Sequence, residues 1–181
     1  MNAFEQIIAG LLKQEGYWTI TDYKVNLPKA KKVELGKPSM PRPEIDVLAY
    51  MAVTNTLLWV ECKSFLDSSG VKSSYLTDKE NVNAPRYKVF TWDEFRTIVT
   101  EELIKQTSEC GLVQPNPNIE YGLATGRIAT NDDRRSLHEH FQKNGWFLFD
   151  EKWIKERLAK LAGIGYEDDV AIIVAKLFTG K

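Results

Sequence analysis

The chain has 181 residues, which is enough for one domain with a sizeable hydrophobic core. Its formal net charge of −1 argues against a protein whose whole surface binds nucleic acid. No stretch approaches the ~20 consecutive apolar residues of a membrane-spanning helix, and the two cysteines lack metal-site spacing, as expected in a reducing compartment. These features predict a single cytoplasmic domain over residues 1–181, with no membrane association.

The N-terminal residues predict an amphipathic helix over residues 3–15, ended by Gly16. Its apolar stripe consists of Phe4, Ile7, Ile8, Leu11 and Leu12. Glu5 lies at the edge of this stripe and could face the next layer of the fold, or it could form a capping box with Asn2. A strand is expected over residues 17–27.

A local excess of positive charge lies in residues 24–42. The basic residues are Lys24, Lys29, Lys31, Lys32, Lys37 and Arg42, and Glu34 is the acidic residue. Prolines at positions 28, 38, 41 and 43 exclude a regular central element. Two interpretations stay open for this stretch, a segment that contacts phosphate groups and an ordinary solvated loop.

Residues 43–63 predict a hairpin of two antiparallel strands joined by a short polar link. A two-residue loop at positions 54–55 would place Asp46 opposite Lys63. Because side chains alternate between the two faces of a strand, Asp46, Glu61 and Lys63 then share one face of the sheet. The other face is apolar and carries Ile45, Val47, Ala49, Met51, Val53, Leu58, Val60 and Cys62.

Two carboxylates beside an ammonium group suit a hard divalent cation and an anionic substrate. Mg²⁺ prefers carboxylate oxygens, keeps several waters and shares oxygens of substrate phosphates. Water on such a metal becomes a nucleophile near neutral pH, and Lys63 could orient that water or stabilise the reacting phosphorus group. The alternative is that Glu61 and Lys63 form an ion pair at a solvated strand end, with Asp46 as a cross-strand partner.

The connection after Lys63 is long and carries the basic residues Lys72, Lys79, Arg86 and Lys88. Long connections within a domain are usually functional or disordered. This one is interpreted either as a loop that contacts substrate or as an insertion without a role. In the first case, Tyr75 and Tyr87 would be available to pack on bases or sugars.

The remaining residues predict alternating helices and strands. Thr91 and Glu94 form a capping box that opens a helix ending near Cys110, with Trp92, Phe95, Val99 and Leu103 expected on its inward face. Asn131 and Asp150 cap two later helices. The later elements are a strand over residues 119–130, a helix over 131–144, a strand over 146–149, a helix from 151 to about 162 and a helix over 167–179. The predicted class is α/β with a mixed sheet.

This arrangement resembles the PD-(D/E)xK nuclease superfamily, which has the restriction-endonuclease-like fold. The resemblance rests on the order helix, three antiparallel strands, helix and strand, and on the acids and lysine that these elements carry. The motif stands here as Pro43-Glu44-Ile45-Asp46 and Glu61-Cys62-Lys63, and Phe4-Glu5 is similar to the first-helix acid of some branches. The similarity covers about residues 3–150, which leaves residues 151–181 as a helical extension.

The resemblance implies roles for five residues. Asp46 and Glu61, together with the carbonyl oxygen of Cys62, would bind Mg²⁺, or Mn²⁺ in its place. Lys63 would assist the attacking water, and Glu5 would complete the metal shell.

The motif departs from the plain Pro-Asp form because Glu44 and Ile45 separate Pro43 from Asp46. Side-chain alternation favours Asp46 over Glu44 as the metal-facing acid. Glu15 also projects near the apolar stripe of the first helix, but from its last turn, and is a weaker alternative to Glu5.

The predicted function is that of an Mg²⁺-dependent endonuclease or phosphodiesterase that hydrolyses DNA. Basic side chains expected to contact phosphates are Lys29, Lys31, Lys32, Lys37, Arg42, Lys72 and Arg86. The alternative is a non-catalytic nucleic-acid-binding or scaffold module of the same fold that acts as a subunit of a larger complex. A homodimer would suit cleavage of both strands of a duplex.

Overall fold

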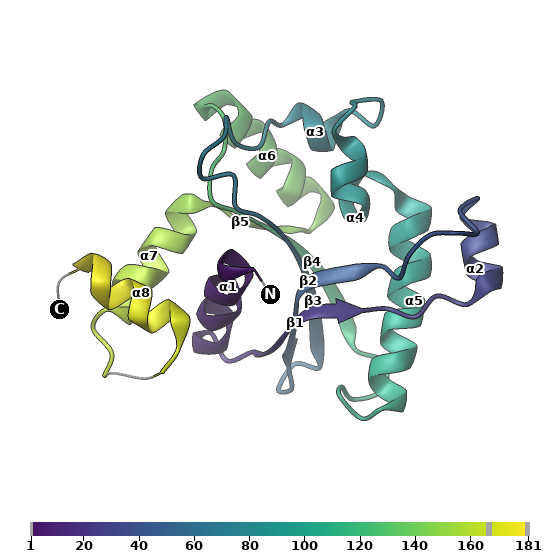
Figure 1. Cartoon of the computed structure of the whole chain (residues 1–181), viewed down its shortest axis with the longest axis horizontal. Coiled ribbons are helices and arrows are strands. Elements are labelled where there is room, and N and C mark those ends of the chain that lie inside the picture. Colours follow the sequence, from purple (N-terminus) through teal and green to yellow (C-terminus); the bar gives the residue numbers. More distant parts are fainter. Residues whose placement is uncertain (1, 166–167, 180–181) are drawn as a thin grey trace.

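The structure is a computed structural model that describes residues 2–165 and 168–179. A five-stranded mixed sheet forms its centre (Figure 1). The strands lie in chain order across the sheet, namely β1 (Trp18–Lys24), β2 (Glu44–Met51), β3 (Thr56–Lys63), β4 (Asn118–Thr125) and β5 (Phe147–Phe149). β1, β2 and β3 pair antiparallel, whereas β3, β4 and β5 run parallel. The predicted α/β class with a mixed sheet is confirmed.

One face of the sheet is covered by three helices, α1 (Ala3–Gln14), α7 (Glu151–Leu161) and α8 (Val170–Thr179) (Figure 1). We call it the α1 face. Its core includes Ile8, Leu11, Leu12, Val47, Val60, Cys62, Ile154 and Ile172. The two C-terminal helices therefore share one hydrophobic core with α1 and the sheet.

The opposite face, which we call the α5 face, is covered by α5 (Asp93–Glu109) and α6 (Asn131–Asn144) (Figure 1). Four short helices lie on the same side, namely α2 (Lys29–Glu34), α3 (Ser74–Thr77), the 3-10 helix η1 (Ala84–Tyr87) and α4 (Lys88–Thr91). The basic stretch before β2 is thus not a central element, as predicted, but it does contain α2. Of the helices in the described residues, none is both long and apolar enough to cross a membrane.

Local capping signals set several helix starts. The side chain of Asn2 accepts a hydrogen bond from the N–H of Phe4 at 3.0 Å, and Asp150 caps α7 as predicted. Thr130 caps α6, one residue earlier than the predicted Asn131. The predicted start of the last helix at residue 167 lies outside the described residues, and α8 runs from Val170.

The predicted capping box at Thr91 is wrong. Thr91 ends α4, and its hydroxyl donates to the carbonyl oxygens of Ala84 and Tyr87 at 2.9 and 3.1 Å. Helix α5 instead begins after Trp92, whose side chain makes no capping hydrogen bond. The hydroxyl therefore secures the preceding turns of the chain rather than the start of α5.

The hairpin register differs from the prediction by two residues. Met51 and Thr56 form the last pair of β2 and β3, so the loop contains four residues rather than two. Asn55 in this loop adopts a φ of 48°, and its side chain accepts a hydrogen bond from the Tyr50 hydroxyl at 2.9 Å. The observed loop is thus held by side-chain contacts that a two-residue turn would not make.

A shift of two residues leaves most side chains on the predicted face, because alternation has a period of two. The prediction that Asp46 lies opposite Lys63 is nevertheless wrong. Ile45 was predicted for the other face, yet it belongs to the core of the α5 face, and Val53 lies in the loop and is 95% exposed. The alternation is interrupted at Asp46, and the neighbouring strand β1 is irregular at the same level, where Asp22 has a φ of 56°.

The connection from β3 to α5 is ordered and contributes to the core. Val71 forms an isolated bridge with Ile128, and Leu76 and Phe90 are buried. Tyr87 is fully buried, so the expectation that it packs on bases is wrong. This connection is therefore a structural part of the α5 face rather than a mobile insertion.

Gly126 follows β4 and lets the chain pass close to the segment after Lys63. A Cβ at this position would lie 2.3 Å from the carbonyl oxygen of Ser64. We expect Gly126→Ala to lower the free energy of unfolding by about 1–3 kcal/mol, because the backbone next to Lys63 must move, and urea denaturation measures this. Gly165→Ala, whose Cβ would meet no atom within 4 Å, is the control, and equal losses in both variants would contradict the close approach.

Candidate active site at the open end of the hairpin

The motif residues meet where β2 begins, β3 ends and α1 starts. The carboxylate of Asp46 accepts a hydrogen bond from the backbone N–H of Cys62 at 2.7 Å. This bond fixes the acid of β2 against β3, between Glu61 and Lys63 along the chain. The structure therefore brings Asp46, Glu61 and Lys63 together, although by a different register from the one predicted.

Glu61 and Lys63 form a close ion pair. The ammonium nitrogen lies 2.5 Å from Glu61 Oε1, and both side chains are 17% exposed. Lys63 also lies over the ring of the buried Tyr87, 5.9 Å from its centroid. The pair is thus mostly removed from water, unlike the solvated strand-end pair considered as an alternative.

Both carboxylates of the hairpin are harder to ionise than usual. Burial raises the pKa of Glu61 to about 7, and the charge of Asp46 adds to the rise, while Lys63 opposes it. Burial also raises the pKa of Asp46, against the effects of the Cys62 N–H and the Lys63 charge. One ammonium group does not compensate two buried carboxylates, so the site favours an additional positive charge.

Glu5 lies behind this cluster, at the start of α1, and is only 8% exposed. Burial, and then the charge of Asp46, raise the pKa of Glu5, while the backbone N–H of Asn2 lowers it. Oε2 of Glu5 is buried and has no hydrogen-bond partner in the described part of the chain. The two sequence interpretations therefore coexist, because Glu5 interacts with the helix start at Asn2 and is also buried close enough to Asp46 to feel its charge.

The acids do not form a ready-made cage for a cation. Among residues 2–165 and 168–179, no group of three His, Cys, Asp or Glu side chains is arranged to hold a metal ion. Oε1 of Glu61 is instead occupied by Lys63. A cation at this site would therefore use few protein oxygens and would compete with Lys63 for one of them.

The two alternative acids take different places. Glu44 is exposed and pairs with Lys24 at 3.3 Å, and it also lines the pocket that contains Glu61. Glu15 lies beyond the far end of α1 and accepts from Arg157 at 3.1 Å, about 15 Å along the helix from Glu5. Glu15 is therefore remote from the cluster, whereas Glu44 borders it but is paired with Lys24 and is more exposed than Asp46.

Some of the predicted phosphate contacts gather beside the cluster. A pocket of about 240 Å³ next to Glu61 is lined by Arg42 and Arg86, and Lys37 lines an adjacent hollow. Other predicted contacts do not line either hollow. These are Lys29, Lys31, Lys32 and Lys72, of which Lys31 pairs with Glu34 and Glu101.

The sequence analysis included Lys88 only as one basic residue of a connection that could contact substrate, and it gave no binding role to Trp92. Lys88 lines both hollows, and Trp92 lines the larger one. The signal was present, because residues 85–92 interleave basic and aromatic side chains, a pattern suited to nucleic acids. Assigning Trp92 to the core face of a helix concealed that signal.

No model of a known protein family matches this sequence, and comparisons with curated proteins and with solved structures also give no match. What the site can do therefore has to follow from its own residues.

Ionisation of Glu61 should destabilise the metal-free fold. Its pKa is about 7 in the folded chain, against 4.5 for an unperturbed glutamate, so the folded state holds the proton over this range. The associated stability is complete below the lower value and is lost as the pH rises through the upper one. In EDTA, we expect the free energy of unfolding to fall from pH 5 to pH 8 by on the order of 1–3 kcal/mol more in the native protein than in Glu61→Gln. Chemical denaturation at each pH measures this, and parallel profiles would show that Glu61 is not perturbed.

Proposed function

We propose that this chain is an Mg²⁺-dependent phosphodiesterase that hydrolyses DNA, with a restriction-endonuclease-like core of the PD-(D/E)xK type. The observation that carries the proposal is the convergence of Asp46, Glu61 and Lys63 at one end of the hairpin. Glu5, from a separate element, adds a third acid to the same end. Such a cluster of perturbed ionisable groups is typical of functional sites.

The order of elements supports the fold proposed here. An initial helix precedes three antiparallel strands, and α5 then leads to β4, which lies parallel to β3. This is the order on which the resemblance rests. The motif residues also occupy the expected elements, with Asp46 on β2 and Glu61 and Lys63 on β3.

The residues fit a divalent cation of the Mg²⁺ type. Asp46 and Glu61 would hold it, with the carbonyl oxygen of Cys62 as a further ligand, and the unpartnered Oε2 of Glu5 would lie in its outer shell. Mg²⁺ is commonly bound by one or two carboxylates, with water and substrate phosphate as the remaining ligands, which agrees with the lack of a three-acid cage in the described residues. When bound, the metal would supply an activated water and neutralise charge on the phosphate.

The side chains of the chain itself have distinct roles in this proposal. The Cys62 N–H keeps the Asp46 carboxylate in one orientation. Lys63, released from Glu61 when that carboxylate binds the metal, would offer its ammonium to the phosphate oxygens, where negative charge develops. Arg42 and Arg86, beside Glu61, would position the DNA backbone through contacts that do not depend on sequence.

One observation favours the alternative of a non-catalytic binding module. Lys63 forms a close ion pair with Glu61, and a chain that never binds a metal would need this pair to offset the buried charge. The two functions differ in their response to metal, which the next two experiments measure.

Removal of any member of the cluster should abolish cleavage. Asp46→Asn, Glu61→Gln and Lys63→Ala are each expected to slow hydrolysis of plasmid or linear DNA by about 10²–10⁴-fold, measured with Mg²⁺, Mn²⁺ or EDTA. Lys24→Ala, which removes an exposed lysine from the same sheet, should keep native activity. Loss of cleavage in Glu44→Gln but not in Asp46→Asn would contradict the assignment of the metal-binding acid.

Metal should stabilise the native fold independently of turnover. Millimolar MgCl₂ or MnCl₂ is expected to raise the melting temperature, because a ligand at a hundredfold excess over its Kd adds about 2.7 kcal/mol of stability. Asp46→Asn should lose this response and Glu44→Gln should keep it. A native protein that binds DNA, but whose melting temperature does not change with either metal, would support the non-catalytic module.

A further inference from the structure

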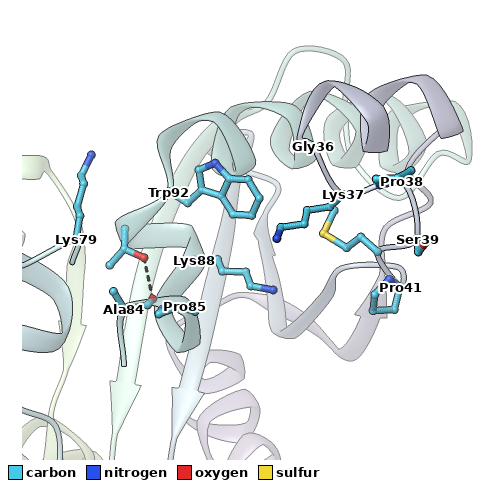
Figure 2. Close-up of a pocket in the computed structure, with 12 residues that line it drawn as sticks. Gly36, Lys37, Pro38, Ser39, Pro41, Lys79, Ala84, Pro85, Lys88 and Trp92 are labelled. Atoms are coloured by element: carbon cyan, nitrogen blue, oxygen red, sulfur yellow. Dashed lines mark hydrogen bonds between the residues drawn. The ribbon is translucent and has the colours of Figure 1, made fainter. Parts of the chain in front are cut away.

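Two hollows join beside the candidate site. The pocket next to Glu61 and a larger hollow of about 760 Å³ share four lining residues, Met40, Pro41, Pro85 and Lys88. We call the larger hollow the Trp92 groove. Residues 36–41 form one wall, and side chains from residues 84–92 form the other (Figure 2). The Trp92 groove therefore runs directly into the pocket that contains Glu61.

The walls of the Trp92 groove offer flat apolar surfaces. Trp92 packs one ring face on Phe95, with centroids 5.5 Å apart and planes at 24°, while the side chain borders the open space of the groove (Figure 2). Pro38, Pro41 and Pro85 line the remainder. A half-buried ring that is held against Phe95 and lines a hollow can stack a planar group at little cost in side-chain freedom.

The groove is positively charged. Lys37 and Lys88 reach into the space between the walls (Figure 2), and Lys79 also lines the groove. Lys79 is paired with Asp93 at 2.8 Å, whereas neither Lys37 nor Lys88 has an ion-pair partner in the described part of the chain. No acidic side chain of the described residues lines this hollow. Its charge therefore suits a polyanion.

We propose that the Trp92 groove binds unpaired nucleotides of a DNA strand that leads into the Glu61 pocket, a specificity that rests on the proposed function. A base would stack on Trp92, and the flanking phosphates would lie against Lys37 and Lys88. Stacking on an aromatic ring between lysines is how many proteins bind single strands without reading sequence. The volume lies within the roughly 300–1,000 Å³ of small-ligand pockets, which accommodates a nucleotide or two but not a duplex. The preferred substrate is therefore DNA with a single-stranded segment or end.

The test is binding in EDTA, where cleavage does not occur. Fluorescence anisotropy compares a labelled single-stranded oligonucleotide with the same sequence as a blunt duplex. We expect the single strand to bind more tightly, Trp92→Ala to weaken it by about tenfold, and Trp92→Phe, which keeps a ring on Phe95, to retain most of the affinity. Lys37→Ala and Lys88→Ala should each reduce the slope of log K against log salt by about 0.7.

Two controls match these substitutions in chemistry but lie elsewhere. Trp18→Ala removes a tryptophan that is 51% exposed on β1, and Lys152→Ala removes an exposed lysine of α7. Both should bind the single strand like the native protein. Equal losses in the controls, native affinity in a folded Trp92→Ala, or displacement of the oligonucleotide by a polyglutamate peptide of equal charge would each overturn the inference.

The outcomes also separate this inference from the proposed function. Single-strand binding that depends on Trp92, without metal-dependent cleavage of any DNA, would support the groove and contradict the phosphodiesterase. Cleavage that depends on Asp46, with duplex and single strand bound equally by native protein and Trp92→Ala, would support the phosphodiesterase and overturn the groove.

Discussion

The hydrogen bond from the backbone N–H of Cys62 to the Asp46 carboxylate, 2.7 Å long, is the contact on which the candidate site depends. It joins an acid at the start of β2 to the strand that carries Glu61 and Lys63. Because regular side-chain alternation stops at Asp46, strand pairing alone would not determine the orientation of this carboxylate. The hydrogen bond does so instead, and its partial burial strengthens it.

This placement costs stability in the metal-free protein. Burial raises the pKa values of Glu5, Asp46 and Glu61, and Lys63 compensates for only part of the negative charge. A fold tolerates such an electrostatic cost when the rest of the structure supplies enough stability. Here that stability comes from two hydrophobic cores on opposite faces of one sheet. The same end of the sheet opens into the basic Trp92 groove, so positive charge adjoins the acids without neutralising them.

The sequence predicted the elements better than the details that shape the site. Apolar periodicity identified the order of the strands and the long helices but not the four short helices, since both faces of the sheet are buried and leave a strong pattern in the long elements. The hairpin register was wrong because the four-residue loop depends on Asn55 and Tyr50, a contact that local turn preferences do not encode. Because the register shift is two residues, the side chains of Glu61 and Lys63 lie on the predicted face of β3. Trp92 packs against the core as predicted, but the sequence could not show that it also lines a groove, because the opposite wall is formed by residues 36–41, which are distant in sequence and close in space.

The most direct test of the account is a crystal structure of the protein with Mn²⁺, in which anomalous scattering locates the metal. The account predicts one peak bonded to oxygens of both Asp46 and Glu61 at about 2.1 Å, the distance of Mg²⁺-type coordination, with the Lys63 ammonium displaced from Glu61. A peak on Glu44, or an intact Glu61–Lys63 pair with no metal at saturating Mn²⁺, would contradict it.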